Sequence, residues 1–269
     1  MNPRLGMFGA TKDIEAISAA GYDCIEMQVS EIVNLDESHF NEACKRLKNS
    51  PIVCRVLDNP VPLDKVIAND DFDLDFFQGY LQKGAERGER MGVKYYVFGN
   101  GRTRSLPTSG DVEKAKQKNL NFMRMLAEIT SKHGITVLIE PLAPQVSNVI
   151  QSLAEALDYA NEIGNMNIGT LLDYRWFWAM NHPIQEIYKY GPLVSHIHMD
   201  NPATEFPRRV VPKLDDGHDY SPFISAIKEI HYDGIISIEA NTFTDYEREM
   251  KQCLDFFRYY GIIPARNNK

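Results

Sequence analysis

Acidic and imidazole side chains occur at the ends of four apolar segments in the second half of the sequence. Glu140 ends ITVLIE, Asp173 ends IGTLLD and Glu239 ends GIISIE. His198 is the second histidine of VSHIHMD. Carboxylates and imidazoles are common ligands of divalent metals, and they also act as general acids and bases. If the four segments are neighbouring strands, these groups form one candidate site for metal or proton-transfer chemistry.

The direction of these side chains follows from alternation along a strand. His196 and His198 share one face of VSHIHMD, while Ile197 and Met199 share the other. The apolar pair is expected to meet surrounding helices, which places the two histidines on the inner face. The same alternation places Glu140, at the end of ITVLIE, and Glu239, at the end of GIISIE, on the inner face of their strands.

Three carboxylates and one imidazole at a shared point repel each other unless a cation neutralises them or protons are taken up. Three oxygens and one nitrogen suit Mn²⁺, Zn²⁺, Mg²⁺ or Co²⁺ and leave positions for water or substrate oxygens. We therefore predict one divalent metal ion bound by Glu140, Asp173, His198 and Glu239. Each of these residues has an ordinary structural alternative when it is considered alone. A carboxylate at a strand end can cap the next helix or pair with an arginine, and His198 can be a hydrogen-bonded histidine of the core.

The elements that would position this site alternate along the whole chain. Short apolar runs separated by longer amphipathic ones are typical of repeated βα units, with helical periodicity clearest over 71–91, 111–132, 150–164 and 245–260. Strands are expected at Arg4–Phe8, Tyr22–Met27, Ile52–Leu57, Val93–Phe98, Ile135–Glu140, Ile168–Asp173, Val194–Asp200 and Ile235–Glu239. With a length of 269 residues, this pattern predicts an α/β fold, a single-domain (β/α)8 TIM barrel over residues 1–269. Catalytic groups of such barrels lie at the C-terminal ends of the strands.

The amino-acid composition limits the kinds of molecule that the protein is expected to bind. The chain has 29 Lys and Arg against 37 Asp and Glu, a formal charge of -8 that disfavours nucleic acid. No signal peptide and no apolar run long enough to span a membrane is recognisable, so no membrane partner is expected. The four cysteines lack CxxC spacing and indicate a reducing compartment, which predicts a cytoplasmic location.

One long irregular segment, 201–218, follows the seventh strand. Its length exceeds the usual βα connection and predicts a lid or substrate loop, with a structural insertion or an oligomer contact as the alternative. Arg208, Arg209 and Lys213 in this segment could reach a phosphate or carboxylate of a substrate, although such charges are more often simply solvated.

Six short segments, taken in series, resemble the xylose-isomerase-like barrel superfamily. They are GYDCIEM at 21–27, VLIEPL at 137–142, LLD at 171–173, HIHMDN at 196–201, DGHDY at 216–220 and GIISIE at 234–239. That group contains sugar and sugar-phosphate isomerases and epimerases, hydroxypyruvate isomerase and abasic-site endonucleases. The resemblance implies that His198 is the ligand histidine, with His196 behind it. It also implies that Glu140 and Glu239 are the catalytic acid and base.

The chain departs from the ketose 3-epimerase branch of this group at three positions. It has Trp176 where that branch has a histidine, Thr204 where it has an arginine, and Val146 where it has a glutamate. Those groups handle substrate oxygens in the branch. The departures therefore argue against a free-ketohexose 3-epimerase, while the metal ligands are kept.

The resemblance predicts a metal-dependent isomerase or epimerase that acts through an enediolate. Its substrate would be a small sugar, a sugar phosphate or a related polyol or keto compound. Trp176, His196, Arg175 and Arg208 are the residues expected to contact it. The alternatives are a keto-inositol dehydratase, an abasic-site endonuclease and a non-catalytic sugar-binding barrel. A homodimer or homotetramer is expected by analogy.

Overall fold

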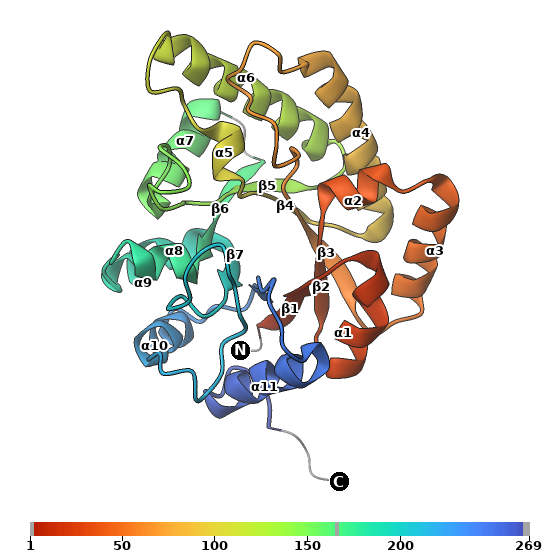
Figure 1. Ribbon diagram of the computed structural model, residues 1–269, viewed down its shortest axis with the longest axis vertical. Helices are drawn as coiled ribbons and strands as arrows, with labels where there is room; N and C mark the ends of the chain where they lie inside the picture. Colours follow the sequence, from red (N-terminus) through yellow and green to blue (C-terminus); the bar gives the residue numbers. More distant parts are fainter. Residues whose placement is uncertain (1–2, 165–166, 266–269) are drawn as a thin grey trace.

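The computed structural model describes residues 3–164 and 167–265. Eight parallel strands pair in sequence order and close into a barrel, as Figure 1 shows. The strands are β1 (Arg4–Phe8), β2 (Cys24–Gln28), β3 (Val53–Asp58), β4 (Tyr95–Phe98), β5 (Thr136–Ile139), β6 (Ile168–Asp173), β7 (Val194–Met199) and β8 (Ile235–Ile238). The predicted TIM barrel is confirmed, and no strand end differs from its predicted position by more than two residues.

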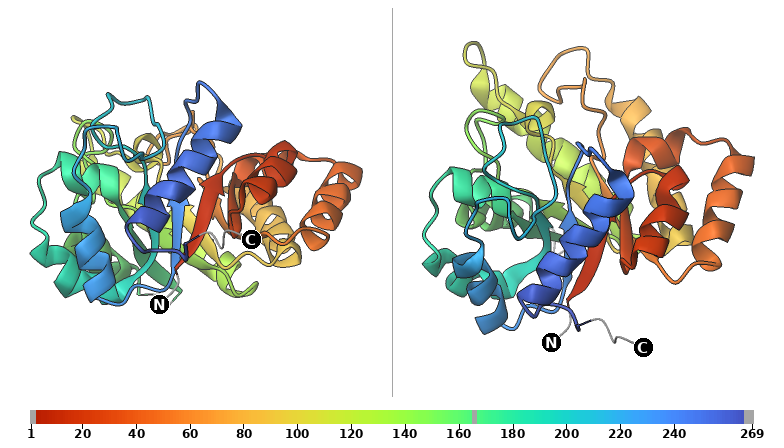
Figure 2. Two further views of the ribbon diagram at one scale, coloured as in Figure 1. Left: turned by 90° about the horizontal axis from the view of Figure 1, so that it is seen from below. Right: turned by 60° about the horizontal axis from the view of Figure 1, so that its bottom comes forward.

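Helices form an outer ring around these strands (Figures 1 and 2). They are η1 (Thr11–Asp13), α1 (Ile14–Ala20), α2 (Val29–Asn34), α3 (Glu37–Lys48), α4 (Leu74–Met91), α5 (Gly101–Arg104), α6 (Val112–Ser131), α7 (Leu153–Ile163), α8 (Tyr174–Ala179), α9 (Gln185–Tyr190), η2 (Gly191–Leu193), α10 (Ser221–Glu229) and α11 (Tyr246–Tyr259). The four segments with the clearest periodicity are α4, α6, α7 and α11. Over the described residues, none of the helices combines the length and apolar character that crossing a membrane requires.

Local sequence explains where the long helices begin. The side chains of Asp73, Asp111 and Ser152 each accept a hydrogen bond from a backbone N–H in the first turn of α4, α6 and α7. Such caps satisfy backbone donors that have no partner within the helix. The three caps therefore fix where α4, α6 and α7 begin.

The barrel interior is filled in layers. One layer is apolar and consists of Cys24, Val56, Val97, Leu138, Leu171 and Ile235. Since side chains alternate along a strand, the residue two positions later on each strand points inward at the C-terminal mouth. On β2, β3, β5 and β6 those residues are acidic: Glu26, Asp58, Glu140 and Asp173. The apolar layer thus supports a ring of buried acids at the mouth.

The connection from β7 to α10 spans residues 200–220, and its residues Phe206, Pro207 and Arg209 reach the mouth of the barrel. It is tied to the segment after β8 through Asn241, whose side chain accepts a hydrogen bond from Arg209 N at 3.0 Å and donates one to Pro207 O at 2.9 Å. Asn241 N also donates to Arg209 O at 3.0 Å. These bonds fix Arg209 above the strand ends.

Candidate metal centre

The four residues predicted as metal ligands come together at the C-terminal mouth. Glu140 directly follows β5, Asp173 ends β6, His198 lies in β7 and Glu239 directly follows β8. One ligand atom from each lies within 4.8 Å of the other three. The strands that carry them are consecutive neighbours, and the register sets Asp173 beside His198. The convergence inferred from parity is therefore present in the fold.

The imidazole of His198 lies between two groups of carboxylates. Its Nε2 is 3.0 Å from Glu26 Oε1, and its Nδ1 is 3.2 Å from Glu140 Oε1 and 3.3 Å from Glu239 Oε2. Burial alone would raise the pKa of Glu26, but the charges of and hydrogen bonds from His198 and His196 bring it well below its usual range. The ionised Glu26 thus accepts a hydrogen bond from the Nε2–H group of His198. In the neutral ring, the Nδ1 lone pair then faces the cluster, as a metal ligand requires.

Burial also sets the protonation of the other groups. It raises the pKa of Glu140 to about 8. Burial by itself would lower the pKa of His198, but Glu26, Glu140 and Glu239 together raise it well above its ordinary value. The cluster therefore holds protons near neutral pH that a dication would displace on binding.

Arg209 brings a positive charge to the cluster from the β7–α10 loop. Its Nη1 lies 3.2 Å from Asp173 Oδ2 and 2.9 Å from Glu239 Oε2. The guanidinium is buried, and its carbon lies 5.3 Å from the ring centroid of Trp176. Arg208, the residue expected to contact substrate, is exposed and does not line the cavity described below. The loop therefore delivers Arg209 to the site in its place.

The donor set fits a divalent cation. Glu239 Oε2 is buried and accepts no well-aligned hydrogen bond within the described residues, despite its ion-pair distance to Arg209. Asp173 Oδ1 accepts the backbone N–H of Arg175 at 2.6 Å, so Oδ2 is the oxygen that faces the cluster. A Cβ at Gly99 would overlap Glu140 Oε2, so glycine at this position leaves the space that the carboxylate occupies. Hard oxygens with one imidazole nitrogen are a ligand set for Mn²⁺, Zn²⁺, Mg²⁺ or Co²⁺.

A cavity of about 640 Å³ opens above the cluster, and Glu140, Glu239 and Arg209 line it. One wall is apolar: Trp176 packs with Leu142 and Val146. Trp176 and Val146 stand at the positions where the ketose 3-epimerase branch has its histidine and glutamate. The opposite wall is polar and is formed by Gln28, Asp58, Asn59 and Asn100. This polar wall therefore comes from the C-terminal ends of β2, β3 and β4.

Asp58 is a cavity residue that the sequence interpretation omitted. Its Oδ2 accepts hydrogen bonds from Gln28 at 2.9 Å and Asn59 at 2.6 Å. Its Oδ1 is buried and has no partner among the described residues. Burial, with the charge of Glu239 adding to it, raises the pKa of Asp58 to about 7. The parity of β3 could have identified it, because Asp58 ends the strand in phase with Val56.

Arg175 and His196 lie outside the cavity, unlike their expected substrate contacts. Arg175 Nη2 is 2.6 Å from Asp200 Oδ2, and its Nη1 donates to Thr204 O at 2.6 Å. Both partners belong to the β7–α10 loop, so the guanidinium of Arg175 stabilises that loop. His196 is fully buried beneath His198, with Nε2 3.0 Å from Glu26 Oε2. Of the four residues expected to touch substrate, Trp176 alone lines the cavity.

Comparison with known proteins agrees with this arrangement. A family model described as a xylose isomerase-like TIM barrel matches residues 14–260. The chain belongs to that family, which confirms the resemblance carried by the six short segments.

Individual relatives share the fold at low identity. An inosose isomerase from Halalkalibacterium halodurans is 24% identical over 245 residues, which is 85% of this chain and 81% of that protein. The structure of a D-psicose 3-epimerase in the presence of D-fructose matches with a TM-score of 0.80 at 16% identity, covering 96% of this chain and 99% of the other. A 3-keto-D-glucoside 4-epimerase from E. coli matches with a TM-score of 0.79 at 17% identity, covering 96% and 100%.

Proposed function

We propose that this protein is a divalent-metal-dependent isomerase or epimerase of a sugar, a sugar phosphate or a related keto or polyol compound. The observation that carries the proposal is the convergence of Glu140, Asp173, His198 and Glu239 within 4.8 Å at the mouth of the barrel. The relatives are an inosose isomerase and epimerases of D-psicose and of a 3-keto-D-glucoside, which supports a carbohydrate substrate.

Each residue of the candidate site has its own role in the proposed reaction. Glu140, Asp173, His198 and Glu239 would hold a divalent ion, which would supply electrophilic assistance to a carbonyl and a neighbouring hydroxyl of the substrate. Glu140 and Glu239 reach the cavity from β5 and β8. One glutamate takes the proton from the carbon beside the carbonyl, and the other returns a proton to the opposite face. Return to the same carbon gives epimerisation, and return to the adjoining carbon of the enediolate gives isomerisation.

The remaining cavity residues orient the substrate. Arg209 lies between Asp173 and Glu239 and places its donors next to the acid–base pair, where substrate oxygens would lie. Trp176 closes the apolar side. Asp58 and Gln28 offer hydrogen-bonding groups on the polar side.

The test is proton exchange in deuterated water, followed by NMR, with the metal-loaded protein and a panel of ketoses, ketose phosphates and inososes. The proposal predicts exchange at the carbon beside the carbonyl for at least one of these. Glu140→Gln and Glu239→Gln should each lower its rate by about 10²–10⁴-fold. An unsaturated product would indicate a dehydratase instead. The absence of exchange with every metal and every compound would contradict the proposal.

A further inference from the structure

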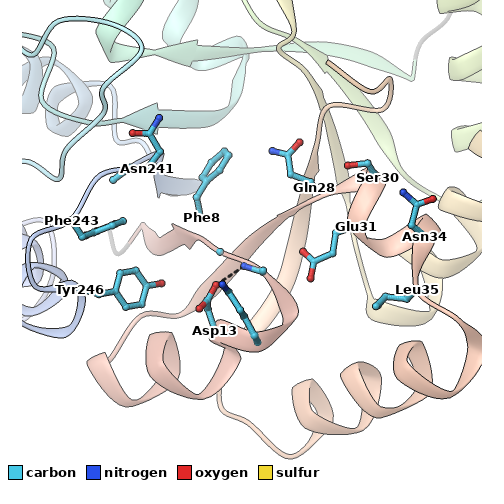
Figure 3. A pocket seen from close by; sticks show the side chains of 14 residues that line it. Phe8, Asp13, Gln28, Ser30, Glu31, Asn34, Leu35, Asn241, Phe243 and Tyr246 are labelled. Carbon is cyan, nitrogen blue, oxygen red and sulfur yellow. Dashed lines mark hydrogen bonds between the residues drawn. The ribbon is translucent and has the colours of Figure 1, made fainter. Parts of the chain in front are cut away.

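A second cavity, of about 930 Å³, borders the one above the metal cluster. Phe8, Gln28, Ala240 and Asn241 line both, so the two cavities adjoin on the β1 side of the mouth, and the second is called the groove below. Figure 3 shows this second part, which lies between α2 on one side and the start of α11 on the other. The combined space is much larger than a single hexose ring needs, since pockets of about 300–1,000 Å³ hold drug-sized ligands.

The groove exists because the connection after β1 is short and small. Only Gly9 and Ala10 separate β1 from η1. Two carboxylates stabilise this turn. Asp13 Oδ2 accepts a hydrogen bond from Ala10 N at 2.9 Å, and Glu31 Oε1 accepts one from Thr11 N at 2.7 Å. No side chain larger than a methyl group rises from these two positions, so the floor of the groove is low and preformed.

The walls of the groove suit a sugar ring. Phe243 and Tyr246 form an edge-to-face pair with centroids 4.7 Å apart on one side. Ser30 and Asn34 lie on the opposite side, as Figure 3 shows. Aromatic rings opposite hydroxyl and amide groups provide stacking surface together with hydrogen bonds, which is what a polyhydroxylated ring can use.

Charge disfavours an anionic occupant of the same groove. The charged residues that line it are Lys12, Asp13 and Glu31, a net negative set that acts against a phosphate group. A neutral sugar ring is not repelled by these carboxylates.

Gln28 lies at the junction between the two cavities, because it lines both of them. Its side chain donates to Asp58 Oδ2 at 2.9 Å, which ties it to the polar wall of the metal cavity. Trp176 lines the metal cavity and not the second one. The second cavity therefore adjoins the polar wall of the metal cavity rather than its apolar wall.

From these observations we propose that the substrate contains two linked sugar rings. The reacting keto sugar lies over the metal cluster, and the second, neutral ring lies in the groove between Tyr246 and Asn34. The reacting ring's position rests on the proposed function. The groove's occupant rests on the groove alone.

Calorimetric binding to the full-length protein tests this, with D-fructose as the single-ring probe and isomaltulose, a glucosyl-fructose with a free carbonyl, as the two-ring probe. The native protein should bind isomaltulose at least about tenfold more tightly than D-fructose. Ala10→Phe, which fills the floor, should bring that ratio close to one, and Tyr246→Ala should lower it. Ala19→Phe, at an exposed position of α1 outside the groove, should keep the native ratio.

Equal affinities in the native protein, no binding of either probe, or a ratio that survives both groove variants would overturn the inference. Proton exchange measured on the same samples separates this result from the proposed function. Preferential binding of isomaltulose without exchange in either probe would keep the second-ring site, and the isomerase would then be contradicted only if the panel of ketoses, ketose phosphates and inososes also showed no exchange. Proton exchange of D-fructose without preferential binding of isomaltulose would support the isomerase and contradict the second-ring site.

Discussion

Glu26 determines which nitrogen of His198 faces the carboxylate cluster. It accepts hydrogen bonds from both buried histidines, at 3.0 Å to His196 Nε2 and 3.0 Å to His198 Nε2. Groups that hold a metal-binding imidazole in this way fix its tautomer and increase its basicity. Glu26 is thus a positioning residue for the proposed ligand.

Glu26→Gln should weaken metal binding by about 10–100-fold, because an amide holds the imidazole less strongly than a carboxylate and can present either an oxygen or an NH₂ group. Calorimetric titration with Mn²⁺ measures the change. Glu42→Gln, at an exposed position of α3, is the control and should bind as the native protein does. Native affinity in Glu26→Gln would contradict the assigned role.

Metal affinity should increase with pH. The pKa of Glu140 is raised to about 8, and that of His198 is raised well above its ordinary value, so both carry protons at neutral pH that the metal must displace. Each displaced proton makes affinity rise about tenfold per pH unit below the pKa of the group that held it. Titrations at pH 6.5 and 7.5 should therefore differ by about tenfold or more, and equal affinities would show that the cluster is already deprotonated.

At the residue level, alternation along regular strands predicts which acids and histidines point into the barrel, and the family resemblance selects His198 rather than His196 as the proposed ligand. Alternation fails where the backbone is irregular. Arg208 and Arg209 are neighbours in a loop with no periodicity, so sequence alone could not show that the second faces the cluster and the first faces solvent. Arg175 is expected at the substrate from its place two residues after Asp173. Its buried partner, Asp200, lies 25 positions away in sequence, so no local pattern shows the pair.

At the scale of the elements, the end of β4 controls the position of Glu140. A side chain at Gly99 would overlap the Glu140 carboxylate, whereas one at Gly79, in the middle of α4, would meet nothing within 4 Å. The two glycines therefore give a matched pair of alanine substitutions.

Gly99→Ala should displace the Glu140 carboxylate and lower both Mn²⁺ affinity and proton exchange. Gly79→Ala should leave both unchanged and stabilise the protein by about 0.5–1 kcal/mol, because alanine is the better helix former. Calorimetry and denaturant unfolding of the two variants check these outcomes. Native Mn²⁺ affinity in Gly99→Ala would show that Glu140 has room to move.

The β7–α10 loop is held by a buried ion pair. Arg175 is 3% exposed and Asp200 is 0% exposed, and they are 2.6 Å apart at their closest atoms. Burial raises the pKa of Asp200 to about 7, which the arginines beside it oppose. The loop that carries Arg209 therefore depends on a charge pair that is expensive to break.

Arg175→Met should lower the free energy of unfolding by about 3–5 kcal/mol, because it removes every arginine hydrogen bond to the buried Asp200 and leaves only Arg209, at 3.7 Å. Arg208→Ala, at the exposed neighbour of Arg209, should change it by less than about 0.5 kcal/mol. Urea denaturation measures both. If Arg175→Met were as stable as the native protein and lost only substrate affinity, the substrate contact expected from the sequence would be correct.

Periodicity predicted the strands and the four longest helices other than α3, but not the short ones. α2 and α8 have six residues each, fewer than two helical turns, so a 3.6-residue pattern has no length over which to repeat. The position of the 200–220 loop is set by hydrogen bonds to Asn241, which no local pattern encodes.

On the scale of the whole molecule, stability and chemistry occupy different layers of one barrel. The apolar layer closes the interior, and the acids above it are held at the mouth, where the loops can add substrate contacts. The formal charge of -8 acts against a nucleic-acid partner and is compatible with a neutral sugar. The proposed dimer or tetramer, the full 1–269 domain and the cytoplasmic location stay predictions.

Anomalous diffraction from crystals grown with Mn²⁺ tests the central claim most directly. One strong peak is expected at about 2.0–2.3 Å from a carboxylate oxygen of Glu140, Asp173 and Glu239 and from Nδ1 of His198. A map with no peak there, in which Arg209 still bridges Asp173 and Glu239, would contradict it.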